Sequence, residues 1–170
     1  MNPSAWLVEN LDLIPHAGVV LDVASGGGRH AVFLAERGWR VHAVDKDAAA
    51  LALLGRVGRV GQVGKITTEC VDLERGEASF GEGCYDAVIV FNYLHRPLMP
   101  AIVRAVRPGG GVLIYETFTA GQAQRGRPRN PDFLLHEGEL PGLVAPLRVI
   151  RAREGDFDGR FVASVVATRE

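Results

Sequence analysis

Residues 18–43 read GVVLDVASGGGRHAVFLAERGWRVHA, and the pattern of this stretch changes twice. A short apolar run rich in β-branched residues precedes Asp22, which is typical of a buried strand, and three consecutive glycines follow. Residues 29–37 carry apolar side chains at helical spacing, and residues 41–45 predict a second strand. A strand, a glycine loop, a helix and a strand together form one βαβ unit of a parallel sheet.

The glycine loop is suited to bind a ligand, because glycine permits positive φ and leaves no Cβ between a ligand and the backbone amides. Gly26, Gly28 and Ala31 match the dinucleotide fingerprint GxGxxG/A, and Asp45 follows at roughly the ribose-binding distance. Asp22, however, precedes the glycines, and its carboxylate would repel a pyrophosphate and attract a cationic amino group. S-adenosylmethionine carries an ammonium, a sulfonium and no phosphate, so the charge pattern favours it over NAD.

Two segments of this unit resemble a known family, the class I S-adenosylmethionine-dependent methyltransferases. LDVASGGGRHAVFLAERG resembles their first motif, and VHAVDKD resembles their second strand, with Asp45 at its acidic end. The resemblance covers nearly the whole chain. VDKDAAAL, FNYLHRPL and ETFTAGQAQRGRPRNPDFLL look like the small bacterial members grouped near the tellurite-resistance methyltransferases. The resemblance implies a single S-adenosylmethionine-binding methyltransferase domain over residues 1–170.

The fold class that we expect is α/β, a doubly wound three-layer Rossmann-like fold whose mostly parallel sheet has seven strands. The last two apolar runs, 147–151 and 160–167, are separated by a short turn sequence and predict a hairpin. Parallel strands need long crossovers, so this pair must be antiparallel. One reversed strand at the edge is the class I methyltransferase arrangement and differs from the standard dinucleotide-binding sheet.

The rest of the chain alternates predicted helices and strands. Residues 47–57 predict a helix with Asp47 as N-cap, and its end frays into glycines that recur every three residues up to Gly64. The further predicted strands are residues 66–71, 85–91 and 112–115, and a helix is predicted for residues 97–107, starting at Pro97.

Composition excludes several classes of protein. The 170 residues are enough for one domain, and 19 basic against 20 acidic residues leave no overall field for nucleic acid or an anionic membrane. We therefore expect no nucleic-acid or membrane partner, a cytoplasmic location, and a monomer or homodimer. Cys70 and Cys84 lie in apolar, strand-like runs, which predicts buried, reduced thiols and no metal site.

Three acidic residues end three predicted strands and form the expected cofactor site. In a doubly wound sheet the carboxyl ends of the strands meet at the point where strand order reverses, so Asp22, Asp45 and Asp72 should converge. The carboxylate of Asp45 can accept from both ribose hydroxyls. The resemblance implies that Asp72 accepts from the adenine amino group, and Asp22 would approach the methionine ammonium. The full set of expected cofactor residues is Asp22, Ala24, Gly26, Gly28, Asp45, Lys46, Asp72, Leu73, Phe91 and Asn92.

The segment after the fourth strand holds the expected catalytic residues. Tyr93 offers a hydroxyl or a π-face, and Arg96 can pair with an anionic substrate. Histidine is a common general base, so His95 either activates an oxygen or nitrogen acceptor, or it caps the next helix or bonds to local backbone. Glu116, after the fifth strand, either orients the acceptor or is a solvated strand end.

The sequence thus predicts an enzyme that transfers the methyl group of S-adenosylmethionine, by in-line displacement, to a small molecule such as a thiol, a metalloid oxyanion or another small anion. Two alternatives remain open. A non-catalytic cofactor-binding module would have the same motif, and an NAD-dependent oxidoreductase would use the same loop.

Overall fold

The computed structural model describes residues 2–57, 66–76 and 78–170. The predicted frayed end of the helix after residue 57 lies outside these residues. The strands are β1 (Val19–Val23), β2 (Arg40–Asp45), β3 (Ile66–Cys70), β4 (Ala87–Phe91), β5 (Gly111–Phe118), β6 (Arg148–Phe157) and β7 (Arg160–Arg169). The α-helices are α1 (Ala5–Glu9), α2 (Arg29–Ala35), α3 (Ala48–Val57), α4 (Met99–Ala105) and α5 (Leu140–Leu143), and the 3-10 helices are η1 (Leu11–Leu13), η2 (Arg96–Leu98), η3 (Ala120–Gln124) and η4 (Pro131–Phe133).

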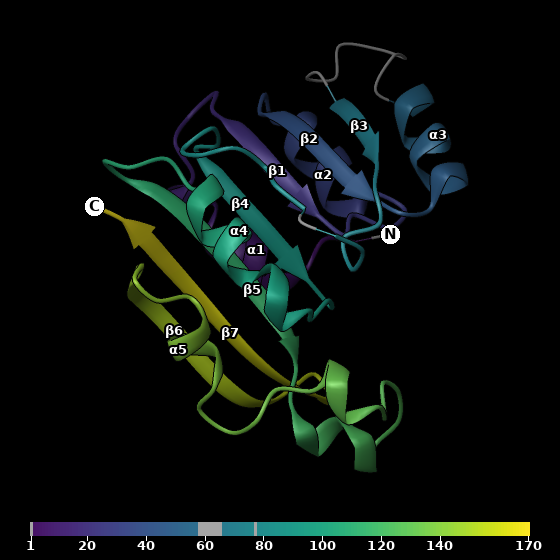
Figure 1. Cartoon of the computed structure of the whole chain (residues 1–170), viewed down its shortest axis with the longest axis vertical. Helices are drawn as coiled ribbons and strands as arrows, with labels where there is room; N and C mark the ends of the chain where they lie inside the picture. The colour runs from purple at the N-terminus through teal and green to yellow at the C-terminus, as the bar shows by residue number, and fades with distance from the viewer. Residues whose placement is uncertain (1, 58–65, 77) are drawn as a thin grey trace.

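The seven strands form one sheet in the order β3-β2-β1-β4-β5-β7-β6 (Figure 1). β1 pairs in parallel with both β2 and β4, so the strand order reverses at β1 and the ligand-binding edge is expected between these strands. β7 runs antiparallel to both β5 and β6. Only two residues separate β6 from β7, and so short a connection requires these two strands to be antiparallel. The predicted seven-stranded, mostly parallel sheet with an antiparallel C-terminal hairpin strand is confirmed. The prediction that the reversed strand lies at the edge is wrong, because β7 lies between β5 and β6 and the edge strand is β6.

Helices cover both faces of the sheet, because consecutive strand residues point to opposite faces and both faces are apolar. On one face, α1, α2 and α3 pack through Leu7, Leu34 and Leu54 against residues such as Ile89. On the other face, α4 and α5 pack through residues such as Ile102 against the central strands. These three layers are the predicted α/β architecture, and the polar strand ends remain free at one edge.

Two details of the predicted elements are wrong. The helix expected from Pro97 is split into η2 and α4, because Pro100 has no N–H to donate to the preceding turn. Cys70 and Cys84 are free but exposed rather than buried. Cys70 ends β3, an edge strand with most side chains in solvent, and Cys84 lies in the turn before β4. No helix of the described segments is long and apolar enough to cross a membrane.

Candidate functional site

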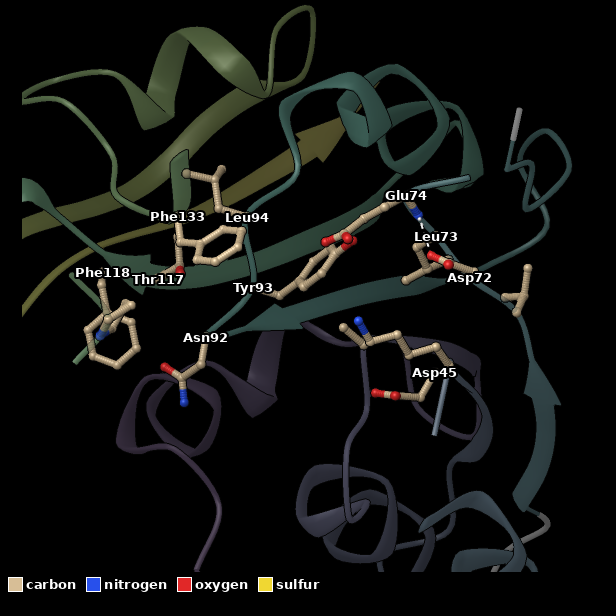
Figure 2. A pocket seen from close by; sticks show the side chains of 14 residues that line it. Asp45, Asp72, Leu73, Glu74, Asn92, Tyr93, Leu94, Thr117, Phe118 and Phe133 are labelled. Carbon is tan, nitrogen blue, oxygen red and sulfur yellow. Dashed lines mark hydrogen bonds between the residues drawn. The ribbon is translucent and has the colours of Figure 1, made fainter. Parts of the chain in front are cut away.

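Two adjoining cavities open at the carboxyl ends of the central strands. The first, called the aspartate cavity below, has a volume of about 300 Å³ and is shown in Figure 2. Its lining comes from the last residues of β2 and β5 and from the segments that follow β1, β2, β3, β4 and β5. The lining residues are Ala24, Asp45, Lys46, Val71, Asp72, Leu73, Glu74, Asn92, Tyr93, Leu94, Thr117, Phe118, Pro128 and Phe133.

The second cavity, called the glycine-loop cavity, is formed by the segment between β1 and α2, the N-terminal residues and the end of β4. It is lined by Asn2, Pro3, Asp22, Ala24, Ser25, Gly26, Gly27, Gly28, Arg29, His30, Val32, Phe33, Glu36, Arg37, Phe91 and Asn92. Ala24 and Asn92 line both cavities, so the two are neighbouring parts of one elongated site.

The structure brings together all the expected cofactor residues, but it divides them between the cavities. Asp45, Lys46, Asp72 and Leu73 line the aspartate cavity, whereas Asp22, Gly26, Gly28 and Phe91 line the glycine-loop cavity. The three carboxylates therefore surround one site without sharing one cavity.

The conformation of the glycine loop depends on close contacts that a side chain at these positions would prevent. Gly26 has φ +54° and donates from its N–H to Oδ2 of Asp45 at 2.8 Å. A Cβ on Gly28 would lie 2.5 Å from Cδ1 of Leu54, so this glycine lets α3 pack against the loop. A Cβ on Gly26 or Gly27 would meet nothing within 4 Å. These two glycines leave open space over the loop, which supports close approach by a ligand.

Asp22 is 2 % exposed, and its Oδ2 has no hydrogen-bond partner. Burial, assisted by the negative charge of Asp45, raises the pKa of Asp22 to about 8, against a lowering effect of Arg29. A buried carboxyl without a partner is costly, and a cationic group beside it would offset that cost. Asp22 is therefore suited to bind a cationic group of a ligand.

Asp45 and Asp72 keep accepting capacity on the side of the aspartate cavity. Asp45 accepts from Gly26 N–H through Oδ2 and from Asp47 N–H, at 2.9 Å, through Oδ1. Asp72 accepts from Glu74 N–H at 3.1 Å and pairs with Arg75 at 3.5 Å. Each carboxylate oxygen has further lone pairs, so both side chains can accept from hydroxyl or amino groups of a ligand.

Tyr93 projects between the charged and the apolar parts of the aspartate cavity in Figure 2. Its hydroxyl is buried and has no partner. Burial and the charges of Glu74, Asp72 and Asp45 raise the pKa of Tyr93 to about 12. At neutral pH this hydroxyl is therefore protonated and can donate a hydrogen bond, but it is no base.

His95 and Arg96 line neither cavity. The guanidinium of Arg96 forms a bidentate pair with Glu139, at 2.6 and 2.9 Å, and also donates to the carbonyl oxygens of Asp132 and Leu134. These bonds tie η2 to the segment that carries Phe133. Arg96 thus bonds to the residues on both sides of Phe133, which lines the aspartate cavity, without lining that cavity itself.

Several lining residues lie outside the set expected from sequence. Thr117 and Phe118 are the last residues of β5 and face the cleft, as the carboxyl end of a parallel strand predicts. Pro128 and Phe133 come from the polar loop after β5 and its end, whose irregular composition only indicated a functional or mobile segment. His30, on α2, accepts from Ser4 N–H at 3.1 Å and stacks on Phe91 with ring centroids 4.3 Å apart. Desolvation lowers the pKa of His30 to about 3, so its ring is neutral.

Glu116 is neither a solvated strand end nor a partner of His95. It is 1 % exposed and is held by Arg153, Arg160, Ser4 and Ser164. Among the described residues no cluster of three His, Cys, Asp or Glu side chains is placed to hold a metal ion.

Comparison with known proteins identifies the class. Solved structures superpose over almost the whole chain: TehB from Haemophilus influenzae has a TM-score of 0.76 at 18% identity, over 99% of this chain and 63% of TehB. An S-adenosylmethionine-dependent methyltransferase from Mesorhizobium loti has a TM-score of 0.77 at 16% identity, over 98% of both chains. A TehB-like S-adenosylmethionine-dependent methyltransferase from Corynebacterium glutamicum has a TM-score of 0.71 at 18% identity, over 99% of this chain and 90% of that one.

The fold is therefore that of the S-adenosylmethionine-dependent methyltransferases, including TehB-like ones, and the chain spans less than two thirds of the length of TehB itself. A family model described as a methyltransferase domain matches residues 20–110, more than half of the chain. The chain belongs to this methyltransferase-domain family, whose neighbours in structure use S-adenosylmethionine as cofactor. No protein with a curated description matches the sequence.

Proposed function

We propose that the protein transfers the methyl group of S-adenosylmethionine to a small molecule, with the cofactor extended across both cavities. The observation that carries this proposal is the unpartnered Oδ2 of Asp22, a residue that lines the glycine-loop cavity together with Gly26 and Gly27, next to the cavity of Asp45 and Asp72.

The glycine-loop cavity fits the methionine end of the cofactor. Asp22 supplies a buried acceptor for the ammonium, and Arg29, in the same lining, supplies a cation for the carboxylate. Gly26 and Gly27 leave room for the ligand against the backbone. A pyrophosphate in this position would face the Asp22 carboxyl, which disfavours NAD.

The aspartate cavity fits the adenosine end. Asp45 accepts from the ribose hydroxyls, and Asp72 with the backbone of Leu73 faces the adenine ring. Lys46, the residue after β2, is a further charged cofactor candidate and lines the same cavity. Phe91 ends β4 and Asn92, which follows it, lines both cavities, so we assign these two residues to the sulfonium.

A small acceptor is favoured by the size and charge of the site. The whole aspartate cavity has a volume of about 300 Å³, and the adenosine end of the cofactor would occupy part of it, so the remaining space fits only a small acceptor. The net charge of the chain is −1, which gives no attraction for a polyanion such as nucleic acid.

The sulfonium supplies an activated methyl group, so the protein mainly has to align the acceptor. Positioning alone provides effective molarities of about 10⁵ to 10⁸ M. The unpartnered hydroxyl of Tyr93 is available to donate a hydrogen bond to a ligand, at the wall between the cofactor and the methyl acceptor. Arg96 acts as a positioning residue for the segment around Phe133, and His95 accepts at its carbonyl from Leu98 N–H at the start of η2.

Isothermal titration with S-adenosylmethionine and with NAD tests the proposal. We expect micromolar binding of the former and no binding of the latter. Asp45→Ala should weaken binding of S-adenosylmethionine by about 1 to 3 kcal/mol through loss of charged hydrogen bonds. Asp47→Ala is the matched control, because Asp47 caps α3 through Ala50 N–H outside both cavities. Formation of S-adenosylhomocysteine with an acceptor panel separates an enzyme from a non-catalytic binding module.

A further inference from the structure

The part of the aspartate cavity farthest from Asp45 and Asp72 is apolar. Leu94, Phe118, Pro128 and Phe133 line it, with the hydroxyl of Thr117 as a polar group. In Figure 2, Leu94, Phe118 and Phe133 lie on the side of Asn92 and Tyr93 that faces away from the acidic residues. Phe133 is 46% exposed, unusual for a large aromatic side chain, and its ring belongs to the cavity wall. This wall fits a flat apolar body.

The charges that line the cavity disfavour an anionic acceptor. The described lining contains three acidic residues, Asp45, Asp72 and Glu74, and one basic residue, Lys46. The nearby arginines are engaged elsewhere: Arg96 binds Glu139, and Arg160 binds Glu116 beside the ring of Phe118. Arg127 and Arg129 flank Pro128 in sequence and are exposed, but neither lines the cavity. No lining side chain of the described residues is thus a cation on the apolar side.

Among the residues that the structure describes, none on the apolar side is a general base. Its one titratable neighbour is Tyr93, whose hydroxyl stays protonated at neutral pH, and His95 lies outside the cavity. An alcohol would need a base to become nucleophilic in this site, whereas a thiol is partly ionised in solution near neutral pH.

Resting on the proposed function, we propose that the methyl acceptor is a small thiol with an uncharged, apolar body. The thiol loses its proton to solvent, and the thiolate sulfur forms a bond to the methyl carbon as the bond from that carbon to the sulfonium breaks. The electron pair of the broken bond stays on the cofactor sulfur. The products are a methyl thioether and neutral S-adenosylhomocysteine.

Four matched acceptors test this inference, with S-adenosylhomocysteine as the measured product. Phenylmethanethiol has the predicted body; 4-(sulfanylmethyl)benzoate adds one negative charge; 2-sulfanylethanol lacks the apolar ring; and phenylmethanol replaces sulfur by oxygen. We expect kcat/KM for phenylmethanethiol to exceed each of the others at least about tenfold. Compared with 2-sulfanylethanol, it gains the burial of a phenyl ring, which contributes that much or more. The carboxylate of 4-(sulfanylmethyl)benzoate meets no cation on the apolar side, and phenylmethanol has no base to ionise it.

Three variants locate the effect. Phe133→Ala should raise KM for phenylmethanethiol about three- to tenfold, without changing the Kd of S-adenosylmethionine, because part of the ring contact is lost. Phe133→Arg should shift the preference toward 4-(sulfanylmethyl)benzoate. Leu53→Ala is the control, because Leu53 is an exposed apolar residue, 61% accessible, on α3 and outside both cavities.

Each adverse outcome has a separate meaning. If the carboxylate probe or sodium selenite is the better acceptor while S-adenosylmethionine binds normally, the apolar acceptor is wrong and the arginines around Pro128 become the anion site. If S-adenosylmethionine binds but none of the thiols is methylated, the thiol assignment is wrong. If S-adenosylmethionine does not bind, the proposed function fails together with this inference.

Discussion

Ala24 and Asn92 directly follow the neighbouring strands β1 and β4, and both adopt left-handed backbone conformations with φ 56°. They are also the two residues shared by the linings of the two cavities. A non-glycine residue with positive φ carries strain, which is often retained at a ligand-binding site. The strained turns redirect the chain at the reversal of strand order and keep the passage between the cavities open.

Ala24→Val should close that passage. A β-branched side chain at positive φ destabilises the fold, by about 1 to 3 kcal/mol, and its extra methyl groups lie where the cavities meet. We expect a lower melting temperature and greatly weakened binding of S-adenosylmethionine, measured by thermal unfolding and calorimetric titration. Ala17→Val supplies the control, because Ala17 also has φ 56° but is exposed and lines neither cavity. Equal loss of binding in both variants would show that strain alone is responsible.

The neighbouring glycines of the loop should respond differently to alanine. In Gly28→Ala the new Cβ would overlap Leu54 at positive φ, so the free energy of unfolding should fall by roughly 2 to 4 kcal/mol. Gly27→Ala adds a methyl group in open space and should leave stability within about 0.5 kcal/mol. The same methyl group should weaken S-adenosylmethionine binding about tenfold, or 1.4 kcal/mol. Urea unfolding and calorimetry measure the two effects, and unchanged binding in Gly27→Ala would remove the loop from the cofactor site.

Asp22 should make cofactor affinity depend on pH. Its pKa of about 8 means that the free protein holds a proton there at pH 6, whereas the ammonium of the cofactor requires the carboxylate. Affinity should therefore rise from pH 6 toward pH 8, by up to about tenfold per unit, with release of a proton. Titration in two buffers of different ionisation enthalpy measures that proton. Asp22→Asn should abolish both the slope and the proton release, and a slope that persists would assign the titration to another group.

The same residue should lower the stability of the free protein as pH rises. The folded pKa of Asp22, about 8, exceeds the ordinary value of 3.8 for an aspartate, so the folded state binds more protons between these two values. The unfolding free energy then falls as pH increases from about 4 to 8 through this group. Without cofactor at pH 8, Asp22→Asn should have a higher melting temperature than the wild type and an unfolding free energy larger by about 1 to 3 kcal/mol. This difference in unfolding free energy should be smaller at pH 5.

The sequence predicts the structure correctly where a local pattern or a single topological rule determines it. The βαβ pattern of residues 18–45 predicted β1, α2 and β2, and the rule for parallel sheets placed Asp22, Asp45 and Asp72 at one edge. It was insufficient where a side chain depends on a distant partner. Glu116 is buried because Arg153 and Arg160 reach it from β6 and β7, and only the register of the hairpin determines that contact.

The same limit applies to the acceptor side and to the thiols. Phe133 enters the cavity wall because Arg96 and Glu139 hold its segment across 43 residues of sequence, a pairing that no local pattern indicates. Cys70 looked buried from its apolar neighbours, but β3 is an edge strand, and the position of a strand within a sheet is set by all the other strands.

The pair of Arg96 and Glu139 allows a positioning role to be distinguished from substrate binding. Their mutual hydrogen bonds lower the pKa of Glu139 and raise that of Arg96, which is the mark of a stabilising pair. Urea unfolding of Arg96→Ala, Glu139→Ala and the double variant should give a coupling energy of about 1 to 2 kcal/mol. Because Glu139 lines neither cavity, both single variants should raise KM for the acceptor alike and leave the Kd of S-adenosylmethionine unchanged. A far larger loss of kcat in Arg96→Ala than in Glu139→Ala would instead mean that the guanidinium leaves its partner to contact the substrate.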